Sequence, residues 1–195
     1  MSALTNRLYQ LAGLVPVGAS VLDVGCSDGR LLAHLRDDRQ VDGRGIEIDP
    51  ERVALAVARG LSVVQGDAEH DLAAFPGNSV DYAILSETLQ AMARPALVLA
   101  ELVRIGRRAI IAFPNFGHWR VRADLLLTGR MPVTRRLPQS WYDTPNIHLC
   151  TVRDFLALAE EMGLTIEQQH FLSYRKRIRF CPNLRADHAL FVLRK

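Results

Sequence analysis

The stretch VLDVGCSDGRLLAHL, residues 21–35, decides the fold of this chain. It begins as a buried β-strand, passes through a turn of small residues and continues as a helix. Gly25 and Gly29 stand in the turn, where glycine lets the backbone adopt unusual φ angles and approach a ligand closely. A strand, a glycine-containing turn and a helix in this order are typical of a loop that binds a nucleotide-like cofactor.

Two common phosphate-binding loops do not match this stretch. A dinucleotide fingerprint that starts at Gly25 requires glycine at two positions where the chain has Ser27 and Arg30. A P-loop requires Gly-Lys-Ser/Thr, which does not follow. Asp23 argues further against a pyrophosphate, because a carboxylate that faces the ligand repels it. The same carboxylate favours a ligand that carries an ammonium or sulfonium charge.

Strands and helices alternate on both sides of this loop. This rhythm predicts right-handed βαβ units and a parallel sheet with helices on both faces. About a dozen residues without a helical pattern join the last two strands, so these two are expected to be antiparallel. We expect helices at 3–14, 50–59, 95–105 and 151–163, and a further helix that begins at residue 31. We expect seven strands, at 20–25, 41–49, 61–67, 79–88, 107–114, 164–174 and 187–195.

A long insert at about residues 114–150 interrupts the alternation of strands and helices. We expect it to lie inside a single domain of residues 1–195. A helix is expected in it from about Trp119 to Leu127. Loops of this length in compact domains are commonly functional or disordered, and the aromatic and apolar content of this one favours an ordered, functional insert. Aromatic residues and arginines are enriched at protein interfaces, and the insert holds both: Phe116, Trp119, Trp141 and Tyr142 with Arg120, Arg122, Arg130, Arg135 and Arg136. The other interpretation is that the tryptophans pack beneath the insert.

Composition and charge exclude several classes of protein. The net charge of +3 does not indicate nucleic-acid binding. The basic cluster YRKRIRF (174–180) is short and precedes an edge strand, where charges also prevent aggregation. No uncharged run reaches the roughly 18 residues of a membrane helix, and the N-terminus lacks a secretory signal pattern, so we expect a cytoplasmic protein. Three scattered cysteines form no disulfide framework, and no metal-ligand spacing occurs.

Further carboxylates follow the next two strands. Glu47 ends the second strand, which is the place for a carboxylate that accepts hydrogen bonds from both ribose hydroxyls. Asp67 follows the third strand, at the position of a residue that touches an adenine edge. With Asp23 and the two glycines, this set resembles the pattern of class I S-adenosylmethionine (SAM)-dependent methyltransferases. The resemblance implies a Rossmann-like fold that contacts SAM or S-adenosylhomocysteine (SAH) through Asp23, Gly25, Cys26, Ser27, Gly29, Glu47, Ile48, Asp67, Ala68 and Ser86.

The rest of the chain is similar to a narrower family. The segments LSETLQAMARP (85–95), FPNFGHWRVR (113–122), GRMPVT (129–134) and WYDTPNIHLCTVRDF (141–155) resemble the methionine biosynthesis protein MetW family, and the similarity runs over roughly residues 16–193. Ser27 and Glu87 depart from the family pattern, where we expect Gly and Gln. The resemblance implies a protein that accompanies and supports a homoserine O-acyltransferase in methionine synthesis.

Candidate catalytic residues are few. Glu87 follows the fourth strand, where methyltransferases commonly face the transferred methyl group, and it could act as a base or only contact SAM. His118, Tyr142 and His148 in the insert are further candidates for acid–base chemistry. Two hypotheses therefore stay open. One is an accessory, SAM-binding partner of the acyltransferase, and the other is an active methyltransferase on a small molecule or protein.

Overall fold

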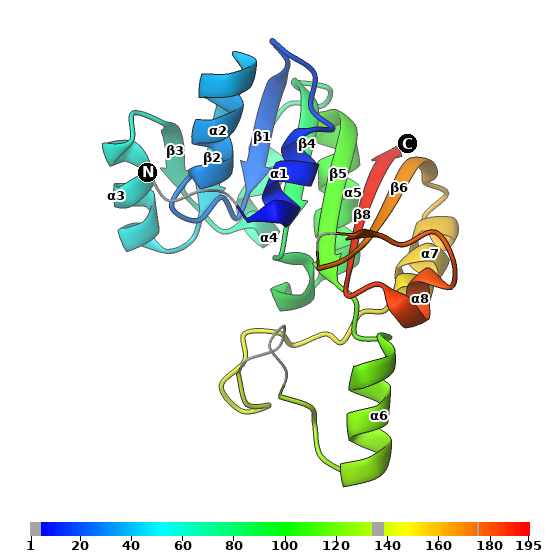
Figure 1. Cartoon of the computed structure of the whole chain (residues 1–195). Coiled ribbons are helices and arrows are strands. Elements are labelled where there is room, and N and C mark those ends of the chain that lie inside the picture. The colour runs from blue at the N-terminus through cyan, green and yellow to red at the C-terminus, as the bar shows by residue number, and fades with distance from the viewer. Residues whose placement is uncertain (1–4, 134–138, 175) are drawn as a thin grey trace.

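The computed structural model describes residues 5–133, 139–174 and 176–195 (Figure 1). Within these ranges, its centre is an eight-stranded sheet in the order β3-β2-β1-β4-β5-β8-β6-β7. The strands are β1 (Ser20–Val24), β2 (Asp42–Glu47), β3 (Ser62–Gln65), β4 (Val80–Ser86), β5 (Gly106–Pro114), β6 (Thr165–Ser173), β7 (Lys176–Arg177) and β8 (His188–Arg194).

The strand directions confirm the expected arrangement, and the expected strand number is wrong. Strands β1 to β5 pair in parallel, whereas β8 is antiparallel to both β5 and β6. The eighth strand, β7, is a two-residue antiparallel partner of β6 at the sheet edge. Two basic residues carry no hydrophobic alternation, so no periodicity could reveal this strand.

The helices fill the connections as the alternation predicts. They are α1 (Asn6–Ala12), α2 (Arg30–Arg39), α3 (Pro50–Ala58), α4 (Ala68–Asp71), α5 (Pro95–Ile105), α6 (Trp119–Thr128), α7 (Val152–Glu161) and α8 (Pro182–Arg185), with short 3₁₀ turns η1 (Leu72–Ala74) and η2 (Leu89–Ala91). Local signals set the ends of the longer ones. Thr151 and Asp154 form a capping box at the start of α7. The four-residue α8, which the sequence pattern does not predict, lies in the connection to β8.

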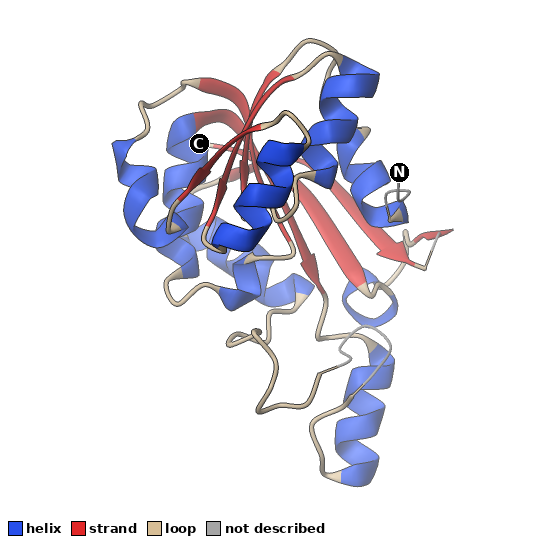
Figure 2. Cartoon of the chain, turned by 90° about the vertical axis from the view of Figure 1, so that its left-hand side faces the viewer, coloured by secondary structure: helices blue, strands red, loops and turns tan. Residues whose placement is uncertain are grey.

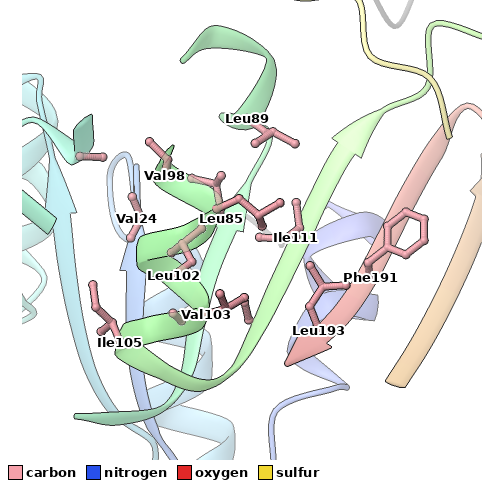
Figure 3. Packing of buried hydrophobic residues seen from close by; sticks show 14 of the residues in the cluster. Val24, Leu85, Leu89, Val98, Leu102, Val103, Ile105, Ile111, Phe191 and Leu193 are labelled. Carbon is pink, nitrogen blue, oxygen red and sulfur yellow. The ribbon is translucent and has the colours of Figure 1, made fainter. Parts of the chain in front are cut away.

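Alternating side chains of the central strands build two cores, one on each face of the sheet. Helices lie on both faces (Figure 2). On one face, Val24, Leu85 and Ile111 pack with Val98 and Leu102 of α5 (Figure 3). On the other face, the neighbouring residues of the same strands pack against α1, α2 and α3. The central part of the sheet is therefore covered on both faces. No helix within the described residues is long and apolar enough to span a membrane.

The insert leaves the sheet after β5 and carries α6 away from the two cores (Figures 1 and 2). Helix α6 matches the expected helix and buries none of its residues. Trp119 and Trp141 are 49% and 73% exposed, so they do not pack beneath the insert. Phe116 is buried and is not available to a partner. Arg135 and Arg136 lie outside the described residues.

Candidate functional site

A cavity of about 740 Å³ opens at the carboxyl ends of β1, β2 and β4. Strand β1 lies between β2 and β4, so the order of the strands reverses at this point. Ligands of open α/β sheets bind in such a crevice. Except for Gly29, all the residues that the sequence suggested as cofactor contacts line this cavity: Asp23, Gly25, Cys26, Ser27, Glu47, Ile48, Asp67, Ala68 and Ser86.

The two glycines of the loop have different surroundings. Gly25 has φ +70°, and a Cβ added there would lie 2.8 Å from Oγ1 of Thr88, so the loop and the end of β4 approach closely. Gly29 has φ +75°, but an added Cβ would lie 2.3 Å from Cδ1 of Leu61 and 3.1 Å from Cβ of Ala56. Gly29 therefore permits close packing between α2 and α3, and it does not line the cavity.

Ser27 adopts the left-handed conformation that the sequence suggested for a glycine position. Its φ is +53°. Its backbone N–H donates to Oε2 of Glu47 at 2.8 Å, and its Oγ accepts a hydrogen bond of 2.7 Å from Arg52. These two contacts tie the loop to the end of β2 and to α3, at a backbone conformation that costs a side chain about 1 kcal/mol relative to glycine.

The substitution Ser27→Gly is expected to tighten SAM binding a few-fold. Glycine removes the strain, so the loop conformation that faces the cavity becomes more populated. Calorimetric titration with SAM measures the effect. Arg52→Gln is the matched control, because it removes the hydrogen bond to Ser27 and keeps the backbone strain. A large loss of affinity in Ser27→Gly alone would contradict this account and would indicate a direct ligand contact by the hydroxyl.

Glu47 is held rigidly at the end of β2. Its side chain is 7% exposed and accepts three backbone hydrogen bonds, from Ser27 (2.8 Å), Ile48 (3.0 Å) and Asp49 (3.1 Å). Two carboxylate oxygens offer about four acceptor positions, so capacity remains for a hydroxyl donor. A preorganised carboxylate at this strand end suits recognition of ribose hydroxyls.

Asp23 is 2% exposed and lines the cavity beside Glu47. Burial, and then the negative charge of Glu47, raise the pKa of Asp23 from 3.8 to about 8. Burial and the same two carboxylates raise the pKa of the Cys26 thiol to about 12. Cys26 is therefore a neutral thiol at physiological pH and not an activated nucleophile. A cationic ligand would relieve the unfavourable negative charge of this region.

Asp67 begins α4 at the end of β3. Its side chain accepts hydrogen bonds from the backbone N–H of Glu69 (2.9 Å) and approaches the ring of His70 (2.9 Å). The backbone hydrogen bond, followed by His70, lowers the pKa of Asp67, so its carboxylate stays ionised. Ile48 and Ala68 supply apolar cavity wall near this end.

Helix α1 closes one side of the cavity, which the sequence pattern does not indicate. Thr5, Arg7 and Leu8 line the cavity. The guanidinium of Arg7 donates to Oε1 of Glu87 at 2.8 Å. The two residues are 80 positions apart, so only the fold brings them together.

Glu87 forms the cavity wall at the end of β4. Its φ is +62°, an uncommon conformation for a residue with a side chain. Oε1 of Glu87 also lies 3.2 Å from Nε2 of His188, which is 1% exposed. His188, from β8, is a second neighbour of the site that sequence reasoning missed, because it is a single polar residue at the start of an apolar strand.

The other candidate catalytic residues do not line the cavity. Nδ1 of His118 caps α6 by accepting from the backbone N–H of Arg120. Tyr142 is 70% exposed, and His148 is exposed. The insert reaches the cavity through Pro145 instead. Within the described residues, no group of three or more His, Cys, Asp or Glu side chains could hold a metal ion.

A family model and a curated relative both match this chain, and both carry the name MetW. The family model described as methionine biosynthesis protein MetW matches residues 6–193. A curated relative from Rhodopirellula baltica, named bifunctional methionine biosynthesis protein MetXA/MetW, is 34% identical over 195 residues. The match covers 93% of this chain and 31% of the relative, so the chain spans about a third of that protein.

Solved structures share the fold at low sequence identity. A SAM-dependent methyltransferase from Archaeoglobus fulgidus is 14% identical with a TM-score of 0.73, and the match covers 97% of this chain and 91% of that one. The [4+2]-cyclase SpnF is 17% identical with a TM-score of 0.69, over 97% of this chain and 81% of that one. The fold is that of the class I methyltransferases, and proteins with this fold differ in their named reactions.

Proposed function

The chain belongs to the methionine biosynthesis protein MetW family, and from this premise we propose that it binds SAM or SAH and acts as an accessory or regulatory partner of a homoserine O-acyltransferase. The observation that carries the proposal is the relative whose name joins MetXA to MetW. We take its MetXA part to be the acyltransferase that the family resemblance implies. Fusion holds two proteins at high local concentration, which favours association between them.

The residues and the charge of the cavity lining support a SAM-like ligand. Gly25 lines the cavity, and a Cβ there would clash with Thr88, so glycine lets the loop pack against the end of β4 while its backbone faces the cavity. Even without Asp23, the lining holds more carboxylates (Asp28, Glu47, Asp67, Glu69 and Glu87) than arginines (Arg7, Arg30 and Arg52). This excess favours a ligand with an ammonium or sulfonium charge. When bound, SAM would supply a methyl group activated by its sulfonium centre.

The surface that we propose for the acyltransferase is the insert. Leu126 and Leu127 of α6 are 85% and 82% exposed, and Trp141 and Tyr142 are 73% and 70% exposed. Large apolar side chains that stay exposed to solvent are available to a binding partner, and apolar surface of this kind is common at interaction sites. Pro145 of the insert lines the cavity, so a partner that contacts this part of the insert would lie next to the ligand site.

A second candidate function is methyl transfer to a small molecule or protein. The observation that favours it is Glu87, a carboxylate that lines the cavity at the end of β4 and lies beside His188. A methyltransferase needs mainly an aligned acceptor and sometimes a base. SpnF shows that the fold alone does not decide the reaction.

Calorimetric titration with SAM and SAH, on the protein alone and with the acyltransferase, tests the proposal. We expect the acyltransferase to change the SAM affinity several-fold and, by linkage, SAM to change the affinity for the acyltransferase by the same factor. Separate elution of the two proteins, with unchanged acyltransferase activity, would contradict partnership. Formation of SAH from SAM with an added acceptor, above a Glu47→Ala control, would favour the second function.

A further inference from the structure

The charged groups of the cavity separate into two ends. Glu47 and Asp67 follow β2 and β3, at the end that suits the adenosine part of a SAM-like ligand. Glu87 follows β4, on the other side of β1. With the adenosine part at that end, the amino-acid part of the proposed ligand would lie toward Glu87. That part carries an ammonium and a carboxylate, and the carboxylate requires a cation.

Three arginines line the cavity, and two of them hydrogen-bond to residues that follow β1 and β2. Arg52 lies on α3, after β2, and bonds Asp49 and Ser27. Arg30 begins α2 and pairs with Asp28 at 2.7 Å. Arg7 is the cavity arginine that contacts the end of β4, through its hydrogen bond of 2.8 Å to Glu87.

We propose that Arg7 binds the carboxylate at the amino-acid end of SAM or SAH, and that Glu87 is the counter-ion it exchanges for this carboxylate. The inference rests on the proposed function and adds the residue that binds the carboxylate of the ligand. Arg7 and Glu87 are 28% and 37% exposed, so their pair is within reach of ligand and solvent. A guanidinium can exchange one carboxylate partner for another and still donate a charge-assisted hydrogen bond.

The surroundings of Glu87 allow the exchange. Its Oε1 already lies 3.2 Å from Nε2 of His188, so the carboxylate keeps a polar neighbour when Arg7 moves. Arg7 belongs to α1, which covers one side of the cavity. Contact between Arg7 and the ligand would therefore hold α1 over the ligand.

Decarboxylated SAM provides the matched ligand, because it lacks the carboxylate and keeps the adenosine, sulfonium and ammonium groups. For Arg7→Gln, we expect calorimetry to show at least a tenfold loss of SAM affinity and less than a twofold change for decarboxylated SAM. For Glu87→Gln, we expect SAM affinity to rise several-fold with no gain for decarboxylated SAM, because Arg7 no longer has to leave a counter-ion.

Two further variants make the test specific. Arg177→Gln removes a contact with Gln10 of α1 outside the cavity, and it should leave both affinities unchanged. The proposal would be overturned if Arg7→Gln weakened both ligands equally or left SAM binding unchanged. It would also be overturned if the carboxylate-specific loss occurred in Arg30→Gln instead. If the wild type binds decarboxylated SAM and SAM with equal affinity, the proposed ligand is confirmed but Arg7 does not bind its carboxylate. If it binds neither ligand, the proposed function itself fails.

Discussion

Asp23→Asn is expected to stabilise the ligand-free protein at neutral and alkaline pH. Asp23 has a pKa of about 8 in the folded state, against an ordinary value of 3.8. A carboxyl whose pKa is raised by folding contributes stability that is fully present below pH 3.8 and is lost as the pH rises to 8. Asparagine cannot ionise, so the variant escapes this loss. The gain should grow from pH 4 to 8, level off above pH 8, and reach the order of a few kcal/mol.

Denaturant unfolding at pH 5, 7 and 9 measures this gain, with Asp81→Asn as the control of opposite sign. The backbone and hydroxyl of Ser20 hydrogen-bond to Asp81 and lower its pKa. Ionised Asp81 therefore contributes to the stability of the folded state above pH 3.8, and this contribution is lost at lower pH. Asp81→Asn should destabilise the protein at neutral pH. A stability difference between Asp23→Asn and the wild type that does not vary with pH would contradict the assigned ionisation.

The same variant should bind SAM more weakly, because a buried charge that destabilises the empty site favours a cationic ligand. In the wild type, SAM affinity should rise with pH up to about 8 if binding ionises Asp23. In Asp23→Asn this dependence should disappear. Stability and ligand affinity then change in opposite directions, which simple damage to the fold would not produce.

The parts that the sequence predicted are those with local signals. The order of strands and helices follows from hydrophobic periodicity and from the caps. The left-handed conformation of Ser27 follows from its place in the glycine loop. The strand-end positions of Asp23, Glu47 and Asp67 follow from the parallel sheet, whose carboxyl ends meet at one edge.

The parts that the sequence could not predict depend on contacts between distant segments. Arg7 reaches the cavity because α1 packs near the end of β4, and His188 does so because β8 pairs with β5. Neither has a neighbouring motif that marks it. Gly29 looked like a loop glycine, but its surroundings are Leu61 and Ala56, which no spacing rule connects to it.

The double substitution Leu126→Asp and Leu127→Asp is expected to abolish the complex with the acyltransferase. Both side chains are more than four-fifths exposed on α6, so their apolar surface is available to a partner. Burying a charge in an apolar contact is costly unless it is paired, so two aspartates should prevent docking. Co-purification of the acyltransferase from a co-expression culture should fall from a stoichiometric amount to background, and acyltransferase stimulation should be lost with it.

The fold and the ligand site should survive this change, because α6 buries no residue and neither leucine lines the cavity. Exposed substitutions of this kind commonly change stability by no more than about 0.5 kcal/mol, and SAM affinity measured without the partner should equal that of the wild type. Leu55→Asp is the matched control, since Leu55 is 55% exposed on α3, outside the insert. A complex that persists in the double variant, or is lost equally in Leu55→Asp, would place the acyltransferase on another surface.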